Sequence, residues 1–483
     1  MKFLMIIIIL LFWNIATAQN QQTSYSKNLH SCKLVGIADS VLCGSYSVFE
    51  NHKTKKGRKI DLNIIVVPAL NTKSSQFPIF YFDGGPGVAA TKNASWFAEK
   101  NNPYRQNHDI VLIDIRGTGK SNPLHCHSLQ YRNDLMDGFE EMYPPDAVKK
   151  CFDSLSKIAD LSQYTTTNIA GDIDEVRDWL GYNKIHIYGL SYGTRLAQEY
   201  MRRYPSAIET VILQSPTSTG SKMPLYHAAY AQATLEMLFN DCAKDSLCNK
   251  NFPELKKEFY TLMRDGKAQV FSTNYLLADG NLKKLSIPWN SFQTKIRTQM
   301  YDPDALRKIP FIIHQTYKGN WKPFLELYPQ QKKFNDFIAE GLYLCITCSE
   351  DVPFIKKQES DSLTKNTFMG KYRIQQQQQA CDNWVAGSIP SDFLTAVHSD
   401  LPVLIIAGGW DPVTPVSMAK EIAVNLTNSQ LVIIPQMSHT FDGLSNGECF
   451  DDMVLEFIGS SGKLKVNGAC IKTMQPPPYK IKY

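Results

Sequence analysis

Residues 187–195 read IYGLSYGTR, and this stretch decides how the rest of the chain is interpreted. Gly189, Ser191 and Gly193 form the pattern G-x-S-x-G. A strand is predicted before it over 184–188 (KIHIY), and a helical pattern follows it. A sharp turn between a strand and a helix exposes the serine hydroxyl, and small residues beside it let the backbones pass closely. The pattern therefore predicts Ser191 to be a nucleophile rather than part of an ordinary glycine-rich turn.

Short apolar runs that end in Gly- or Pro-rich turns alternate with helical patterns along much of the chain. Strands are predicted at 60–67, 77–82, 110–115, 184–188, 211–213, 403–407 and 431–434. The spacing of Ile169, Ile173, Val176 and Leu180 predicts one buried face of a helix that ends at Gly181. Such alternation is typical of an α/β fold with a mostly parallel central sheet and helices on both faces.

The alternation stops after residue 215 and resumes near residue 400. In between, strand-like runs nearly vanish, and aromatic, Lys-rich and helical segments replace them. We therefore predict a sheet domain made of residues 19–215 and 400–483, interrupted by a mainly helical insertion over 216–399. Insertions of this kind usually form a cap over the carboxyl ends of the strands.

A serine nucleophile needs a base and an acid that orients the base. In this type of sheet the chain order is Ser, then Asp or Glu, then His, each placed after a strand. His439, in PQMSHTFDG, follows the last predicted strand, whereas His398 precedes a strand and lies at the wrong end of the sheet. We therefore predict His439 to be the general base of Ser191.

The acid is expected after the strand before that histidine, where GGWDPVTP contains Asp411. An Asx-turn at Pro412 is the structural alternative for this aspartate. Asp442 and Asp451 follow the histidine and would invert the order. The predicted catalytic triad is therefore completed by Asp411.

Acyl transfer also needs two backbone N–H donors aimed at the developing oxyanion. Tyr192, directly after the nucleophile, supplies the first. The glycine-rich loop 84–87 (GGPG) follows an early strand, and Gly85 is the predicted second donor.

Five segments occur in the order seen in α/β-hydrolases of the prolyl iminopeptidase and tripeptidyl aminopeptidase type: GGPG, DIRGTGKS, GLSYGTR, GGWDPVTP and SHTF. The chain resembles this family, and CDNW at 381–384 resembles its tripeptidyl-aminopeptidase-like branch. The resemblance implies an α/β-hydrolase fold and a serine exopeptidase without a cofactor. Its substrate would be a peptide with a free N-terminus, reached through a restricting cap.

Family members hold the substrate's α-amine with carboxylates of the cap, so the resemblance implies this role for Glu350 and Asp351 in CSEDVPF. A solvated turn before Pro353 is the alternative for both. Iminopeptidases usually carry His before GGPG, whereas this chain has Asp83, which argues against strict specificity for N-terminal proline.

The same triad would serve an esterase or another acyl hydrolase acting on small exported substrates, because fold does not decide substrate. A non-catalytic binding protein is disfavoured, since the serine, acid, base and oxyanion loop are all present.

The N-terminus predicts export. A basic start at Met1-Lys2, an apolar run over 3–13 and Ala16-Thr17-Ala18 have the form of a signal peptide cleaved after residue 18. No later segment is apolar enough to span a bilayer. We expect a periplasmic or secreted protein without membrane attachment after cleavage.

The chain has 11 cysteines, which suits an oxidising compartment. Their positions suggest the local pairs Cys32–Cys43, Cys126–Cys151, Cys242–Cys248 and Cys449–Cys470. Three cysteines remain, Cys345, Cys348 and Cys381, and one of them must stay odd. The CxxC at 345–348 has no second pair of ligands, so we expect no metal site. The family resemblance implies Cys348–Cys381, with Cys345 odd.

DIRGTGKS at 114–121 ends like a phosphate-binding loop, but Asp114 occupies the position of its first glycine. Pro123 also interrupts the helix that would cradle a phosphate. We interpret the stretch as scaffold with Arg116 in an ion pair. The formal net charge of +5 is spread along the chain without a basic block, which argues against nucleic acid as a partner.

Overall fold

The computed structural model describes residues 28–37, 39–130, 139, 141–276, 280–328 and 338–482. The predicted signal peptide, residues 1–18, lies outside them. Within this part of the chain, no helix has both the length and the apolar character needed to cross a membrane.

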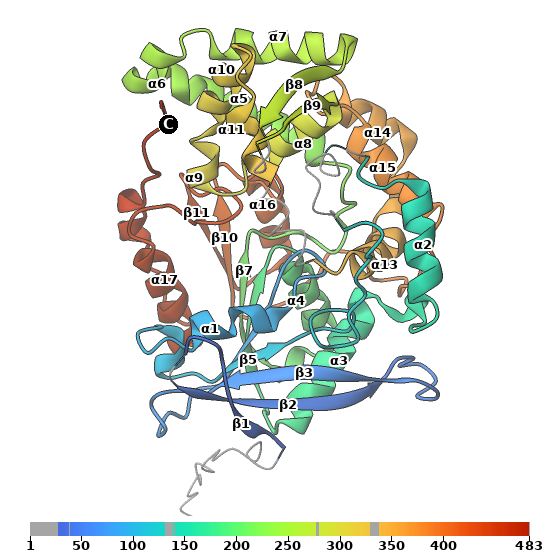
Figure 1. Ribbon diagram of the computed structural model, residues 1–483. Helices are drawn as coiled ribbons and strands as arrows, with labels where there is room; N and C mark the ends of the chain where they lie inside the picture. Colours follow the sequence, from blue (N-terminus) through green and yellow to red (C-terminus); the bar gives the residue numbers. More distant parts are fainter. Residues whose placement is uncertain are drawn as a thin grey trace, which may run out of the picture.

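A nine-stranded sheet forms the centre of the molecule (Figure 1). In spatial order its strands are β1 (His30–Lys33), β2 (Ser40–Phe49), β3 (Lys59–Val67), β5 (Ile110–Ile113), β4 (Ile79–Phe82), β6 (Ile185–Leu190), β7 (Ile208–Gln214), β10 (Val403–Gly408) and β11 (Ser429–Ile434). Strands β5 to β11 pair in parallel, whereas β1, β2 and β3 pair with their neighbours antiparallel. The predicted mostly parallel sheet is confirmed, and β1 and β2 extend it beyond the strands expected from the sequence.

Helices cover both faces of this sheet. One face carries α3 (Thr166–Trp179), α4 (Tyr192–Arg203) and α16 (Val416–Asn425), and the other carries α1 (Ala94–Phe97) and α17 (Glu448–Gly459). The four apolar residues predicted to form one face of α3 and its end are all buried. Gly181, with φ of +79°, follows the end of this helix. Burial on both faces explains why the parallel strands are continuous apolar runs.

The long insertion between β7 and β10 begins with its own hydrophobic core. This core is built from α5 (His227–Lys244), α6 (Ser246–Asn251), α7 (Leu255–Ala268), α8 (Trp289–Thr298), α9 (Pro303–Leu306), α10 (Ile309–Tyr317), α11 (Lys322–Leu325) and a hairpin of β8 (Phe271–Leu276) and β9 (Leu282–Ile287). The sequence did not predict this hairpin. Figure 1 shows these elements gathered at one end of the sheet as a cap.

The rest of the insertion packs partly with the sheet domain and partly with the cap. Leu342, Leu344 and Ile346 of α13 (Glu340–Glu350) belong to the same hydrophobic core as α3 and α4. A second helix, α15 (Tyr372–Cys381), contributes Ala380 to that core, whereas α14 (Lys357–Thr364) lies beside α5.

The C-terminal end of the chain follows the sheet domain in sequence but packs against the cap. Tyr479 packs into the core of the cap, and its hydroxyl donates a hydrogen bond to Asp241 of α5 over 2.7 Å. The hydrophobic cores therefore do not follow the boundaries expected at 216, 399 and 400. Residues of α13 and α15 pack into a core of the sheet domain, and the C-terminal tail packs into the core of the cap.

Five disulfides join the four cysteine pairs suggested by position and the pair implied by the family resemblance. The Cys126–Cys151 bond ties the loop after β5 to α2 (Pro145–Leu155). The Cys348–Cys381 bond joins α13 to α15, and Cys345 is buried and free. This disulfide fixes the C-terminal turn of α13, a helix that lines the cavity over Ser191.

DIRGTGKS forms scaffold beside the sheet. The Asp114 carboxylate accepts hydrogen bonds from Thr91, Asn63 and the Lys120 amide. Arg116 forms the predicted ion pair, with Nε 2.6 Å from Asp172 of α3. A side chain at Gly119 would collide with the Asp114 carboxylate, so the packing of this turn requires glycine.

Candidate active site

Ser191 lies on a sharp turn between β6 and α4. Its φ is +54°, a conformation that residues other than glycine rarely adopt. A Cβ on Gly189 would lie 2.6 Å from the carbonyl oxygen of Gly193, and one on Gly193 would collide with the carbonyl oxygen of Phe82. The two glycines of the motif are therefore required by packing, and the turn exposes the serine hydroxyl at the carboxyl end of the sheet.

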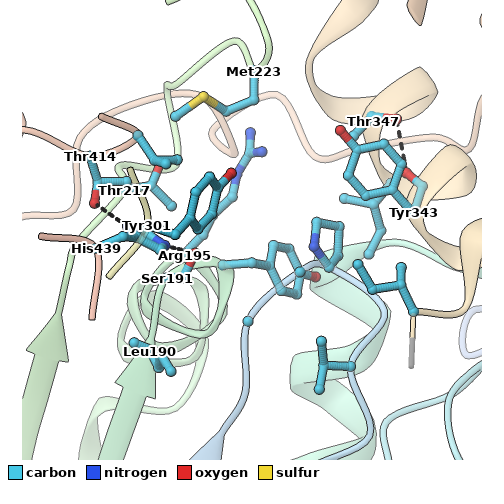
Figure 2. Close-up of a pocket in the computed structure, with 18 of the residues that line it drawn as sticks. Leu190, Ser191, Arg195, Thr217, Met223, Tyr301, Tyr343, Thr347, Thr414 and His439 are labelled. Atoms are coloured by element: carbon cyan, nitrogen blue, oxygen red, sulfur yellow. Dashed lines mark hydrogen bonds between the residues drawn. The ribbon is translucent and has the colours of Figure 1, made fainter. Parts of the chain in front are cut away.

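The structure brings the three residues of the predicted triad together. The Nε2 atom of His439 is 2.9 Å from Ser191 Oγ, and its Nδ1 atom is 2.8 Å from Asp411 Oδ2. His439 and Asp411 are 5% and 3% exposed, so both hydrogen bonds are shielded from bulk water. Figure 2 shows His439 between Ser191 and Thr414.

Asp411 is held as an ionised acceptor. Burial acts to raise the pKa of its carboxyl, but attraction to His439, its hydrogen bond and the amides of Thr414 and Val413 outweigh burial and lower it. The Val413 and Thr414 amides donate to Oδ1 over 2.7 and 2.9 Å, and the Thr414 hydroxyl donates to Oδ2 over 2.8 Å. The aspartate is thus fixed to accept from His439 Nδ1.

Two neighbours of the triad could not be expected from the sequence. The Ser215 hydroxyl, at the end of β7, donates to the carbonyl oxygen of His439 over 2.6 Å. The Tyr301 ring packs edge-on against the His439 ring with centroids 5.2 Å apart. The Thr440 amide donates to the Tyr301 carbonyl over 3.0 Å, so the cap clamps the histidine loop. By contrast, Thr414, which donates to Asp411, lies in the sequence motif GGWDPVTP and could have been expected near the triad.

The loop 84–87 passes directly against the nucleophile. A Cβ on Gly84 would lie 3.1 Å from Ser191 Cβ, so this backbone borders the reacting hydroxyl. The carboxylate of Asp83 accepts from the Gly84 amide over 2.7 Å and from Asn93 Nδ2 over 2.7 Å. In this chain Asp83 therefore shapes the loop at the position where iminopeptidases usually carry histidine.

A cavity of about 310 Å³ opens over Ser191 and His439. The loop 84–87, the end of β6 and the loops after β10 and β11 line its floor, and residues of α5, α8, α13 and α15 line its walls. Figure 2 shows Tyr301 on the His439 side and Tyr343 with Thr347 on the opposite wall. The volume lies at the lower end of the range for small-molecule sites, roughly 300–1,000 Å³.

The structure separates the two carboxylates implied as amine ligands. Asp351 lines the cavity, and its Oδ1 atom accepts from Arg195 over 2.8 Å and from the Met223 amide over 3.2 Å. Glu350 is fully buried outside the cavity lining and accepts from the amide and hydroxyl of Thr166 over 2.6 and 2.7 Å. Consecutive residues at the end of a helix point about 100° apart, so only one of the two reaches the cavity.

Burial sets the protonation of this acidic pair. Burial raises the pKa of Glu350 to about 7, although Arg195 and the hydrogen bonds from Thr166 favour its ionised form. Burial likewise raises the pKa of Asp351 against the attraction of Arg195. Among the described residues, Arg195 is the one cation within 4.0 Å of these two carboxylates, 2.8 Å from Asp351 and 4.0 Å from Glu350.

No group of three or more histidine, cysteine or acidic side chains suited to a metal ion occurs within the ranges that the structure describes.

Comparison with known proteins matches two family models. Residues 78–303 match a model described as alpha/beta hydrolase fold, and residues 366–470 match one described as TAP-like protein. The serine protease Hip1 of Mycobacterium tuberculosis is 21% identical over 458 residues, which are 88% of this chain and 86% of that protein. The tripeptidyl aminopeptidase of Streptomyces lividans is 26% identical over 203 residues, 39% of this chain and 37% of that protein.

Among solved structures, the proline iminopeptidase of Mycobacterium smegmatis aligns with a TM-score of 0.42 and 15% identity. The alignment covers 87% of this chain and 99% of that protein.

Proposed function

The chain has the α/β-hydrolase fold, and from this premise we propose that it is an exported serine aminopeptidase that releases residues or short peptides from free N-termini. One observation carries the proposal: Ser191, His439 and Asp411 form a continuous chain of hydrogen bonds at the floor of a cavity that residues of the cap also line. The similarity to Hip1 and to the tripeptidyl aminopeptidase supports peptide amides as the substrate class.

The reaction follows from the geometry. Ser191 Oγ attacks the scissile carbonyl while His439 Nε2 accepts its proton over the 2.9 Å hydrogen bond. Asp411 holds the imidazole by its Nδ1 and stabilises the imidazolium that forms. His439 then protonates the departing amine. Water next attacks the acyl-enzyme while His439 accepts its proton, and His439 returns this proton to Ser191 Oγ as the acyl group leaves.

The oxyanion is assigned to the backbone amides of Tyr192 and Gly85. Tyr192 is the first residue of α4, where the N-terminal end of the helix favours negative charge. The Gly84 amide donates to Asp83 and Gly85 lines the cavity, so the second donor is assigned to the Gly85 amide. Loss of one such donor typically costs about 2.7–4 kcal/mol of transition-state stabilisation.

Asp351 is the proposed ligand of the substrate's α-amine. Both hydrogen bonds that it accepts within the described residues end on Oδ1, so Oδ2 can accept from a substrate ammonium. Glu350 is left out of this role because Thr166 occupies both of its oxygens.

Export is supported by the covalent structure. Five disulfides within one chain persist in an oxidising compartment and are rare in the cytosol. Together with the signal peptide predicted at 1–18, they favour the periplasm or the exterior as the site of action.

Substitution Ser191→Ala tests the nucleophile. Removal of a triad serine is expected to lower kcat by at least about 10³-fold, because no other group can form the acyl-enzyme. Hydrolysis is measured with aminoacyl and peptidyl p-nitroanilides, and labelling by a fluorophosphonate probe is followed in parallel. Unchanged hydrolysis in the Ser191→Ala variant would remove the triad from the mechanism.

Peptide libraries with free and acetylated N-termini test the exopeptidase reaction, with simple acyl esters as a third set. We expect cleavage of the free peptides and a loss of at least about tenfold in kcat/KM on acetylation, because the ammonium–Asp351 contact is lost. Cleavage of acetylated peptides at equal rates would exclude dependence on the amine, and ester turnover without amide turnover would make the protein an esterase.

A further inference from the structure

The cavity over Ser191 contains a guanidinium group whose hydrogen-bonding capacity is largely unused. Arg297, on α8, is 6% exposed and lines the cavity. Its Nε and Nη2 atoms are buried and have no hydrogen-bond partner in the described part of the chain. A buried N–H without an acceptor destabilises the protein, and more so when the group is charged. A buried guanidinium with unpartnered N–H groups in a cavity wall is a candidate for pairing with an acidic group of a bound molecule.

The position of Arg297 relative to the catalytic residues is fixed by Tyr301. The guanidinium carbon lies 5.3 Å from the centroid of the Tyr301 ring, which itself packs against His439. Arg297 is therefore one aromatic ring away from the catalytic base. A group that paired with Arg297 would belong to a molecule bound at Ser191.

A second arginine of the same cavity also lacks a carboxylate partner. Arg373, on α15, donates to the Tyr343 hydroxyl and to the weakly accepting sulfur of Met142, each over 2.6 Å. No acidic side chain among the described residues lies within 4.0 Å of Arg373 or Arg297, whereas Arg195 of the same cavity is paired with Asp351. The cavity therefore has two cations in its walls that its own anions do not neutralise.

The remaining ionisable groups leave this positive charge in place. His227, at the start of α5, is buried with an unpartnered Nδ1, and burial together with Arg297, Arg373 and His439 holds its pKa well below the usual value. It is therefore neutral and offers one more polar atom to a ligand. Asp83 is occupied by the Gly84 amide and Asn93.

We propose that Arg297, supported by Arg373, binds a carboxylate of the peptide substrate, so that the enzyme prefers acidic peptides. The carboxylate comes either from an Asp or Glu side chain near the scissile bond or from the C-terminus of a very short peptide. A guanidinium recognises the planar carboxylate with two parallel N–H donors, and the unused Nε and Nη2 atoms are such a pair. This inference rests on the proposed peptidase function and adds its substrate class.

Matched substrate pairs measure the preference. One set carries Glu or Gln at each of the first three positions of a peptide p-nitroanilide with a free N-terminus. A second set compares short peptides with a free or an amidated C-terminus. We expect kcat/KM to be at least about tenfold higher for the carboxylate member of one set, and the set that shows it identifies the source of the carboxylate.

Arg297→Met is expected to reduce this ratio to near one, and Arg297→Lys to retain part of it, because lysine keeps the charge but not the paired donors. Arg264→Met, at a side chain on α7 that is 74% exposed, is the matched control and keeps the wild-type ratio. Equal kcat/KM for both members of every pair in the wild type would overturn the proposal, as would an unchanged preference in Arg297→Met.

A protection assay separates this inference from the proposed function. Labelling of Ser191 by a fluorophosphonate is measured with Glu-Ala or Gln-Ala dipeptide as competitor. We expect Glu-Ala to protect at a concentration at least about tenfold lower in the wild type, and this difference to vanish in Arg297→Met. If no peptide is cleaved but Glu-Ala protects selectively, the peptidase function fails and the carboxylate site stands. Equal protection by the two dipeptides overturns the site.

Discussion

Arg116, beside the sheet, and Arg297, in the wall of the cavity, are both buried, but they differ in how their charge is satisfied. All three nitrogens of Arg116 donate, to Asp172 and to the carbonyls of residues 49, 50 and 163. Arg297 has two buried nitrogens without an acceptor in the described part of the chain. A saturated arginine stabilises the protein that contains it, whereas an unsaturated one beside a nucleophile is arranged for something that binds there.

The cluster around Arg195 differs from both, because it contains more carboxylates than guanidinium groups. One guanidinium faces the carboxylates of Asp351 and Glu350, so the cluster has one anion too many when both are ionised. The three clusters thus predict three different responses when one of their charges is removed.

The largest effect is expected at the balanced cluster. Asp172→Asn leaves the Arg116 guanidinium buried without its counter-charge, and breaking a buried pair in this way costs about 3–5 kcal/mol of unfolding free energy. Urea unfolding followed by tryptophan fluorescence measures the loss.

The control for Asp172→Asn is the same substitution at Asp153, whose pair with Lys149 on α2 is exposed. An exposed pair of this kind contributes less than about 1 kcal/mol. Equal losses at Asp172 and Asp153 would mean that the Arg116 cluster does not hold the loop after β5.

The cluster with an excess carboxylate predicts a pH-dependent effect. Burial raises the pKa of Glu350 to about 7 from an ordinary value of 4.5, so the folded protein binds this proton more tightly than the unfolded chain. The stability contributed by Glu350 is therefore complete below pH 4.5 and is lost as the pH rises through 7.

Glu350→Gln removes this dependence, because glutamine can still accept from the Thr166 amide but carries no charge. Relative to the variant, the wild type should lose roughly 3 kcal/mol of unfolding free energy between pH 4.5 and pH 8. Asp351 is unchanged in both proteins, so the difference between their urea-unfolding curves isolates Glu350. Parallel pH curves for the two proteins would show that Glu350 stays ionised.

The triad could be predicted from the sequence because each of its members follows an apolar strand and the order along the chain is fixed by the fold. Ser191 also has a local motif whose glycines are required by close backbone contacts. The ion pair of Arg116 was expected without its partner, since Asp172 is distant in sequence and comes close only when α3 packs on the sheet.

The cavity walls could not be predicted in the same way. Arg297 and Tyr301 reach the site through the packing of α8 against the histidine loop, and neither belongs to a motif or stands out in the helical pattern. The direction of Glu350 depends on where α13 ends. Glu350 is the last residue of this helix and faces Thr166, whereas Asp351, the next residue, faces the cavity. The β8–β9 hairpin was missed because its strands are mostly polar and partly exposed.

The smallest effect on stability is expected at Arg297. Methionine has a similar length and avoids burying a charge whose N–H groups have no acceptors, so Arg297→Met should change the unfolding free energy by no more than about 1 kcal/mol, or raise it. The same substitution at Arg116 leaves Asp172 buried without its arginine partner and should cost about 3–5 kcal/mol of unfolding free energy. Urea unfolding of the two variants side by side therefore measures the contrast between a structural and a ligand-binding arginine. A loss at Arg297 as large as that at Arg116 would show that the cap depends on this guanidinium for its own folding. In that case its open donors would no longer argue for a bound carboxylate.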